Sequence, residues 1–119
     1  MTPDVNVLLA ASRADHLHHA VALDWLERAL TAAGQGERMT LQPMVIASFL
    51  RLVTHPRIFL QPTPVEAAAN FVAALLGAPG VECATLGAEW PKLRALCVER
   101  GLTGNAIPDA WLAAAVLQQ

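Results

Sequence analysis

Charge is scarce in this chain. Charged residues make up only 15% of its 119 residues, whereas hydrophobic residues make up 55%. This composition excludes a disordered chain, because disorder requires low hydrophobicity and high charge. The formal net charge is −2 and the sequence pI is about 6.0, so no basic field marks a protein that coats nucleic acid. A nuclease is not excluded, because bound metal ions can supply positive charge locally.

Signals for membranes, secretion and disulfide frameworks are also missing. No apolar run reaches the roughly 18 residues of a membrane helix, and the uncharged stretch 67–81 is interrupted by glycine and proline. The N-terminus lacks the basic start of a secretory signal. Cys83 and Cys97 form no CxxC pair, so we expect reduced thiols in the core. These absences predict a cytoplasmic protein without a membrane segment.

Several catalytic motifs are absent as well, which narrows the chemistry. There is no GxGxxG or P-loop to cradle phosphates, and no nucleophile elbow or Cys–His pair for acyl transfer. His16 and His19 lie three residues apart, with His18 between them, which suggests zinc as one alternative. No cysteine or fourth histidine lies at a matching spacing, however, so we favour a packed helix start for these residues.

Segments typical of strands and helices alternate along the chain, without an internal repeat or a linker. Short apolar runs predict strands at 5–10, 39–42 and 81–86. Helical spacing and start signals predict helices at 16–33, 43–53, 64–77, 89–100 and, starting near Pro108, within 105–119. This alternation predicts a single α/β domain over 1–119 with a central, mainly parallel sheet.

The helix at 43–53 is apolar on nearly every side, which predicts that it is buried. Its polar members are therefore informative. Arg51 is expected either to extend its charge to solvent or to pair with a buried acid. In the following helix, we expect Thr63 to be the N-cap and Pro64 the first helical residue.

Asp4 and Asp109 lie where a site in such a domain is expected. Asp4 adjoins the first predicted strand and Asp109 lies near the start of the last helix, and ligands of parallel sheets bind at strand ends. Two carboxylates can bind a hard divalent cation, which can activate water against a phosphodiester. Each also has a plain structural interpretation, Asp4 as a surface acid and Asp109 as a first-turn acid favoured by the helix dipole.

Four blocks of the sequence resemble, in the same order, those of the PIN-domain ribonuclease toxins of the VapC family. The blocks are DVNVLL at 4–9, HHAVALDWL at 18–26, SFLRLVTHPR at 48–57 and GNAIPDAWLAA at 104–114. The resemblance implies a PIN-like α/β/α sandwich. It also implies a metal-dependent endoribonuclease toxin of a type II toxin–antitoxin system, with Mg²⁺ or Mn²⁺ as cofactor and RNA as substrate.

The resemblance also implies roles for individual residues. Asp4 and Asp109 would be catalytic metal ligands, and Asn6 would support them. Many family members have a glutamate at or next to the position of Ser48, where this chain has none, and Ser48 can hydrogen-bond a metal-bound water. Asn105 lies four residues before Asp109, so it either orients that carboxylate or caps the helix.

Arg57 is expected either to position an RNA phosphate or to be an ordinary exposed arginine. Trp25, Trp90 and Trp111 are expected to anchor the core or a dimer rather than to stack on bases. By resemblance, the partners are an antitoxin whose peptide covers the acidic pocket and a second copy of the chain that packs through apolar helix surface.

The chain also departs from the family pattern. The family has a further strand and a further aspartate after the helix in which this chain ends, and neither occurs before Gln119. We therefore expect a C-terminally shortened form that lacks C-terminal strands of the sheet. The alternative function is a catalytically weak or inactive PIN-like module that binds an antitoxin or another protein. A third interpretation, an unrelated apolar oligomerisation domain, is disfavoured by the four ordered blocks.

Overall fold

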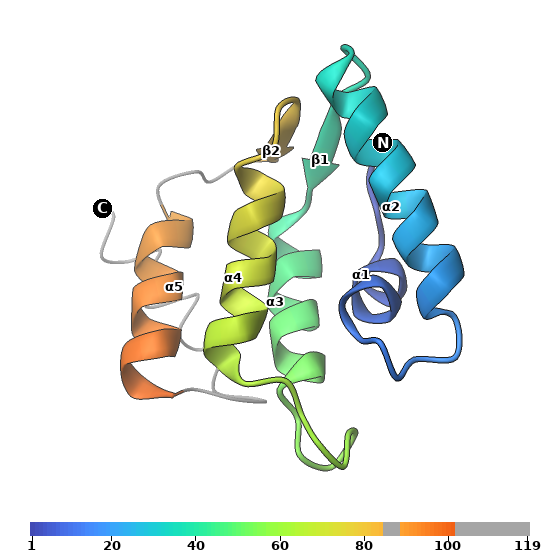
Figure 1. The fold of residues 1–119 in the computed structure, drawn as a ribbon. Coiled ribbons are helices and arrows are strands. Elements are labelled where there is room, and N and C mark those ends of the chain that lie inside the picture. The colour runs from blue at the N-terminus through green and yellow to red at the C-terminus, as the bar shows by residue number, and fades with distance from the viewer. Residues whose placement is uncertain (85–88, 102–119) are drawn as a thin grey trace.

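Helices packed around a short parallel sheet make up the described part of the chain, which in the computed structural model is residues 1–84 and 89–101 (Figure 1). In chain order the elements are α1 (Val5–Ser12), α2 (His19–Gly34), β1 (Met39–Leu41), α3 (Pro43–Val53), α4 (Val65–Leu76), β2 (Val81–Cys83) and α5 (Glu89–Arg100). The predicted α/β class is confirmed. The helix expected within 105–119 lies outside the described residues.

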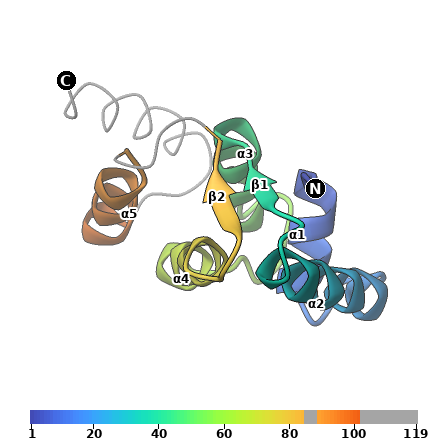
Figure 2. The ribbon, with the colours of Figure 1, turned by 90° about the horizontal axis from the view of Figure 1, so that it is seen from above.

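The sheet joins two segments that are distant in the sequence. β1 and β2 pair in parallel, with Met39 opposite Val81 and Leu41 opposite Cys83. The α2 and α4 helices pack on the strands from one side, and α3 lies on the other (Figure 2). The strands predicted at 39–42 and 81–86 and their parallel pairing are therefore confirmed, although both strands are shorter than predicted.

Met1 extends the sheet along the second edge of β1. Its ammonium group donates to the Arg38 carbonyl at 2.9 Å, and the Thr40 N–H donates to the Met1 carbonyl at 2.8 Å. Pro3 is buried and has no N–H with which to continue this pairing. Pro3 therefore donates no hydrogen bond to β1, and Asp4, whose backbone is still extended, is the N-cap of the helix that follows.

The prediction of a strand at 5–10 is wrong, because these residues form most of α1. Oδ1 of Asp4 accepts a hydrogen bond from the Val7 N–H at 3.0 Å, which satisfies a free donor of the first turn and stabilises the helix start. The helix packs against both α2 and α3, and its middle is buried. A short, uninterrupted apolar run does not by itself distinguish a buried strand from a buried helix.

The core is centred on α3, whose bounds match the prediction. Phe49 of α3 is fully buried and lies 5.4 Å from Phe71 of α4, measured between ring centroids. Both cysteines are free thiols, and burial raises the pKa of Cys97 to about 11. Within residues 1–84 and 89–101, no helix has the length and hydropathy needed to cross a membrane.

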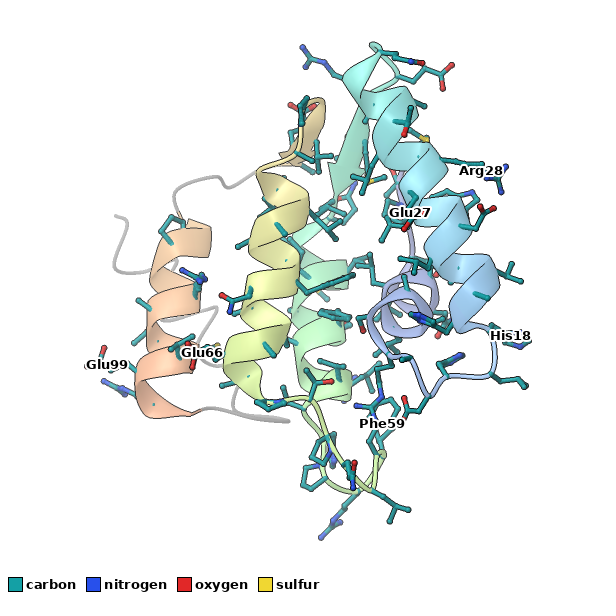
Figure 3. The ribbon with its side chains drawn as sticks, viewed as in Figure 1. His18, Glu27, Arg28, Phe59, Glu66 and Glu99 are labelled. Carbon is teal, nitrogen blue, oxygen red and sulfur yellow. The ribbon has the colours of Figure 1, made fainter. Side chains whose placement is uncertain are left out.

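Arg13, which follows α1, is the most deeply buried charged group that the structure describes, with 8% of its surface exposed. It pairs with both carboxylate oxygens of Asp15, at 3.1 and 2.9 Å, and donates to the Gln61 carbonyl at 3.0 Å and to the Thr63 hydroxyl at 3.1 Å. Its guanidinium carbon lies 3.9 Å from the centroid of the Phe59 ring, a cation–π contact, and Figure 3 shows Phe59 in the segment between α3 and α4. We call these five residues the Arg13 clamp.

The clamp explains why Thr63 does not cap α4, contrary to the prediction. The Thr63 hydroxyl accepts from Arg13, its N–H donates to the Val53 carbonyl at 2.9 Å, and α4 begins at Val65 after Pro64 without a side-chain cap. A long-range hydrogen bond has therefore replaced the local one. Hydrogen bonding from Arg13 also lowers the pKa of the Asp15 carboxyl.

Replacing Arg13 by methionine is expected to lower the free energy of unfolding by about 1.5–3 kcal/mol, the range for hydrogen bonds to charged groups. Urea denaturation would measure the loss, and hydrogen exchange should accelerate first in the amides of 13–18 and 58–63. Arg28→Met is the control, because Arg28 is 72% exposed in its pair with Asp24 and should change stability by less than about 0.5 kcal/mol. Equal losses in the two variants would contradict a special role for the buried guanidinium.

The contribution of the Arg13–Asp15 pair also depends on pH. The folded pKa of Asp15 lies below its ordinary value of 3.8, so folding favours the ionised carboxyl. The stabilisation is therefore present above that pH and is lost as the pH falls through the folded pKa.

Candidate functional site

A pocket of about 560 Å³ lies between α1 and α2. Its polar lining consists of Asp4, Asn6, His16 and His18, and its apolar wall of Val7, Ala10, Val21, Ala22 and Trp25. This volume falls within the range of about 300–1,000 Å³ that is usual for small-molecule sites. An apolar wall with a few polar groups is also typical of such sites.

Asp4 contributes an exposed carboxylate to this pocket. Oδ1 accepts from the Val7 N–H, which fixes the orientation of the group, while Oδ2 makes no hydrogen bond within the described part of the chain. Asn6 follows in the first turn of α1 and is also exposed. The helix start therefore places a carboxylate and an amide together on the pocket lining.

The other predicted site residues do not line this pocket. Ser48 is half-buried within α3, and Arg57 is exposed between α3 and α4. Asp109 and Asn105 lie outside the described residues. The structure therefore brings Asp4 and Asn6 together, whereas the pairing of Asp4 with Asp109 stays a prediction.

Metal binding at Asp4 is compatible with the donors present but needs a further ligand. Among residues 1–84 and 89–101, no three Asp, Glu, His or Cys side chains gather closely enough to hold an ion. Mg²⁺ usually retains several waters and is held by one or two carboxylates together with substrate phosphates. The free Oδ2 of Asp4 fits one of those positions, and a second carboxylate would come from a residue outside this part of the chain.

The zinc alternative for the histidines finds no support in the described residues. α2 begins at His19, so His16 precedes the helix instead of sharing a face with His19. The Nδ1–H of His19 donates to the Ala10 carbonyl at 2.8 Å, which holds that ring against α1. His19 therefore fastens the two helices together, and the ring does not converge with the others on an ion.

His16 and His18 were not predicted as site residues, yet both line the pocket with Asp4. The sequence signal that pointed to them was weak: two histidines close together, separated by six residues from the end of the DVNVLL block. Because the predicted helix was started at residue 16, both were assigned to its packed first turn. In the structure α2 begins later, and this leaves the two side chains in the turn.

Arg57 is a positively charged residue that lies far along the sequence from the pocket-lining residues. Its side chain is exposed and forms no salt bridge with the described residues, and its backbone N–H donates to Nδ1 of His55 at 3.1 Å. Arg51, in contrast, is half-buried in the last turn of α3. Of these two arginines, Arg57 is the one available to an anionic ligand.

Comparison with known proteins identifies relatives over most of the chain. Ribonuclease VapC31 of Mycobacterium tuberculosis (strain ATCC 25618 / H37Rv) is 43% identical over 112 residues, which cover 93% of this chain and 77% of that protein. Ribonuclease VapC25 of the same strain is 41% identical over 119 residues, covering 97% and 80%. VapC ribonuclease Mb2897 of Mycobacterium bovis (strain ATCC BAA-935 / AF2122/97) is 40% identical over 116 residues, covering 97% and 77%.

No family model matches the chain. The relatives alone nevertheless share 40–43% of their aligned residues with it, and the alignments extend over more than three quarters of each relative. The four sequence blocks, the α/β fold with its parallel strands and these relatives agree. The chain belongs to the VapC family of PIN-domain ribonucleases.

Proposed function

We propose that this chain is an endoribonuclease toxin of a toxin–antitoxin pair, and that it hydrolyses RNA phosphodiesters with Mg²⁺ or Mn²⁺ held by Asp4 and Asp109. The main structural support is Asp4, an exposed carboxylate fixed by the Val7 N–H on the lining of a pocket. The relatives named as ribonucleases support RNA as the substrate class.

The bound ion would lower the pKa of a water and neutralise charge on the phosphodiester. The residues of the chain would prepare the site for it. Asp4 and Asp109 would supply carboxylate ligands, and Asn6, in the first turn of α1, would orient the groups around Asp4. Ser48 can donate or accept a hydrogen bond at the edge of such a site. Because the net charge is −2, positioning of the RNA backbone would depend on a few cations such as Arg57.

Inhibition by an antitoxin also fits the surface beside Asp4. Leu17 and Val21 are 90% and 73% exposed, and Val21 lines the pocket. An antitoxin peptide that covered this apolar surface would also cover the Asp4 carboxylate. We further propose that the active form is a homodimer, with a second copy packed on apolar helix surface such as that around Met44 of α3, which is 77% exposed.

The test is cleavage of a labelled RNA by the purified chain in Mg²⁺, in Mn²⁺ and in EDTA. Cleavage in either metal, with none in EDTA, is expected. Thermal unfolding in parallel should show a higher Tm in millimolar Mn²⁺, because an ion that binds only the folded state stabilises it.

Undiminished cleavage in EDTA would contradict the metal-dependent mechanism. A folded chain that cuts no RNA in either metal, but binds an antitoxin, would instead identify the catalytically inactive binding module.

A further inference from the structure

Two imidazole rings project from the turn between α1 and α2. His16 is half-buried and His18 is exposed, and their ring centroids lie 5.9 Å apart with the planes inclined at 46°. Figure 3 shows His18 at the start of α2, on the outer side of the turn. Both rings line the same pocket as Asp4 and Asn6.

Hydrogen bonding leaves His16 with an unused donor. Nδ1 of His16 accepts the His18 backbone N–H at 3.0 Å, so the proton of the neutral ring lies on Nε2. This Nε2–H makes no hydrogen bond to the described residues. The backbone N–H of His16 donates to the Arg13 carbonyl at 3.1 Å, which connects the turn to the Arg13 clamp. A ring held in this way, with a free donor, is prepared to bind a ligand.

The pocket has the chemistry of a nucleotide site. Single-stranded RNA is recognised through bases that stack on aromatic or histidine rings and through hydrogen bonds to base edges and the ribose 2′-hydroxyl. Trp25 packs against the core, as predicted, and also lines the pocket, where with the aliphatic residues it supplies a wall for a base. Asn6, His16 and His18 supply hydrogen-bonding groups.

We infer that His16 and His18 hold one nucleotide of the RNA substrate in this pocket, beside the phosphodiester that lies at Asp4. The subsite presupposes the ribonuclease function proposed above and adds to it the residues that select the base. These rings contact the substrate but take no part in bond cleavage. Their loss therefore raises KM and weakens the preference for particular bases, while kcat changes much less.

The decisive variants are His16→Asn and His18→Ala, singly and together. An asparagine at position 16 can still accept the backbone N–H of residue 18 through Oδ1, so the turn is kept while the ring is lost. Glu27→Gln, on the exposed side of α2 and outside the pocket, is the matched control. Binding of a fluorescent, short single-stranded RNA of random sequence is measured by anisotropy in EDTA, and kcat and KM are measured in Mn²⁺.

The expected result is that each variant binds the RNA about fivefold weaker or more, the effect of losing one stacking contact, with a matching rise in KM and no change in Glu27→Gln. Unchanged binding and KM would overturn the subsite, even if Asp4→Asn abolished cleavage and so upheld the proposed function. Weaker RNA binding in a chain that cuts no RNA would support the subsite and reject the enzyme. Weaker binding of an apolar antitoxin peptide, with RNA binding intact, would overturn the subsite in favour of a peptide groove.

Discussion

Replacement of Asp4 by asparagine is expected to reduce RNA cleavage by more than about 100-fold, because losing a group that merely supports a metal ligand already costs about 10- to 100-fold. Asp109→Asn should have a similar effect. Asparagine is as good an N-cap as aspartate, so the hydrogen bond to the Val7 N–H can be kept while the charge is lost. The Tm of Asp4→Asn in EDTA should therefore stay close to that of the original protein.

The measurement is single-turnover cleavage in saturating Mn²⁺, with urea denaturation of each variant. Asp24→Asn is the control, since Asp24 is 67% exposed on α2 and pairs with Arg28 outside the pocket. Asp4→Ala should lose activity and, in addition, about 1 kcal/mol of stability through loss of the cap. Full activity in Asp4→Asn would exclude this carboxylate as a ligand.

Replacement of Gly80 by alanine is expected to destabilise the protein by about 2–6 kcal/mol. Gly80 has φ +79°, and a residue with a Cβ in such a conformation costs about 1–3 kcal/mol. The added Cβ would also overlap the Ala33 carbonyl oxygen and lie 2.6 Å from its carbonyl carbon, and overpacking costs about 1–3 kcal/mol more. The Gly80 carbonyl accepts from the Met39 N–H at 2.9 Å, so the backbone cannot withdraw without disturbing the sheet.

Gly36→Ala separates these two costs. Gly36 also has positive φ, +106°, but a Cβ there would meet nothing within 4 Å. Urea denaturation should therefore show a loss of about 1–3 kcal/mol for Gly36→Ala and a clearly larger one for Gly80→Ala. Equal losses would mean that the packing of α2 against the start of β2 is looser than the structure indicates.

Much of the fold follows from local sequence patterns. The helices at 43–53 and 89–100 have the predicted bounds. Pro43 is a strong signal for the start of the first helix and Gly101 for the end of the second, and the residue spacing within each segment is helical. The strand predicted at 5–10 failed for a different reason. Its continuous apolar run fits either structure, and the decision depended on the Asp4 cap and on burial between two helices.

The candidate site was harder to predict from the sequence than the fold was. Asp4 and Asn6 were predicted because they belong to a family motif. The nearby histidines have no such motif, and their position depends on where α2 begins and on how the turn is held. Arg13 and Thr63 are 50 positions apart, and no local sequence pattern predicts which of the arginines will hydrogen-bond to Thr63.

The Arg13 clamp has a consequence for the newly made protein. Synthesis proceeds from the N-terminus, so α1, α2 and the intervening turn leave the ribosome well before the segment containing Gln61 and Thr63. Until that segment emerges, Arg13 lacks the partners that anchor the turn with His16 and His18. The turn that carries two of the pocket-lining residues is therefore anchored only after the segment 61–63 has emerged.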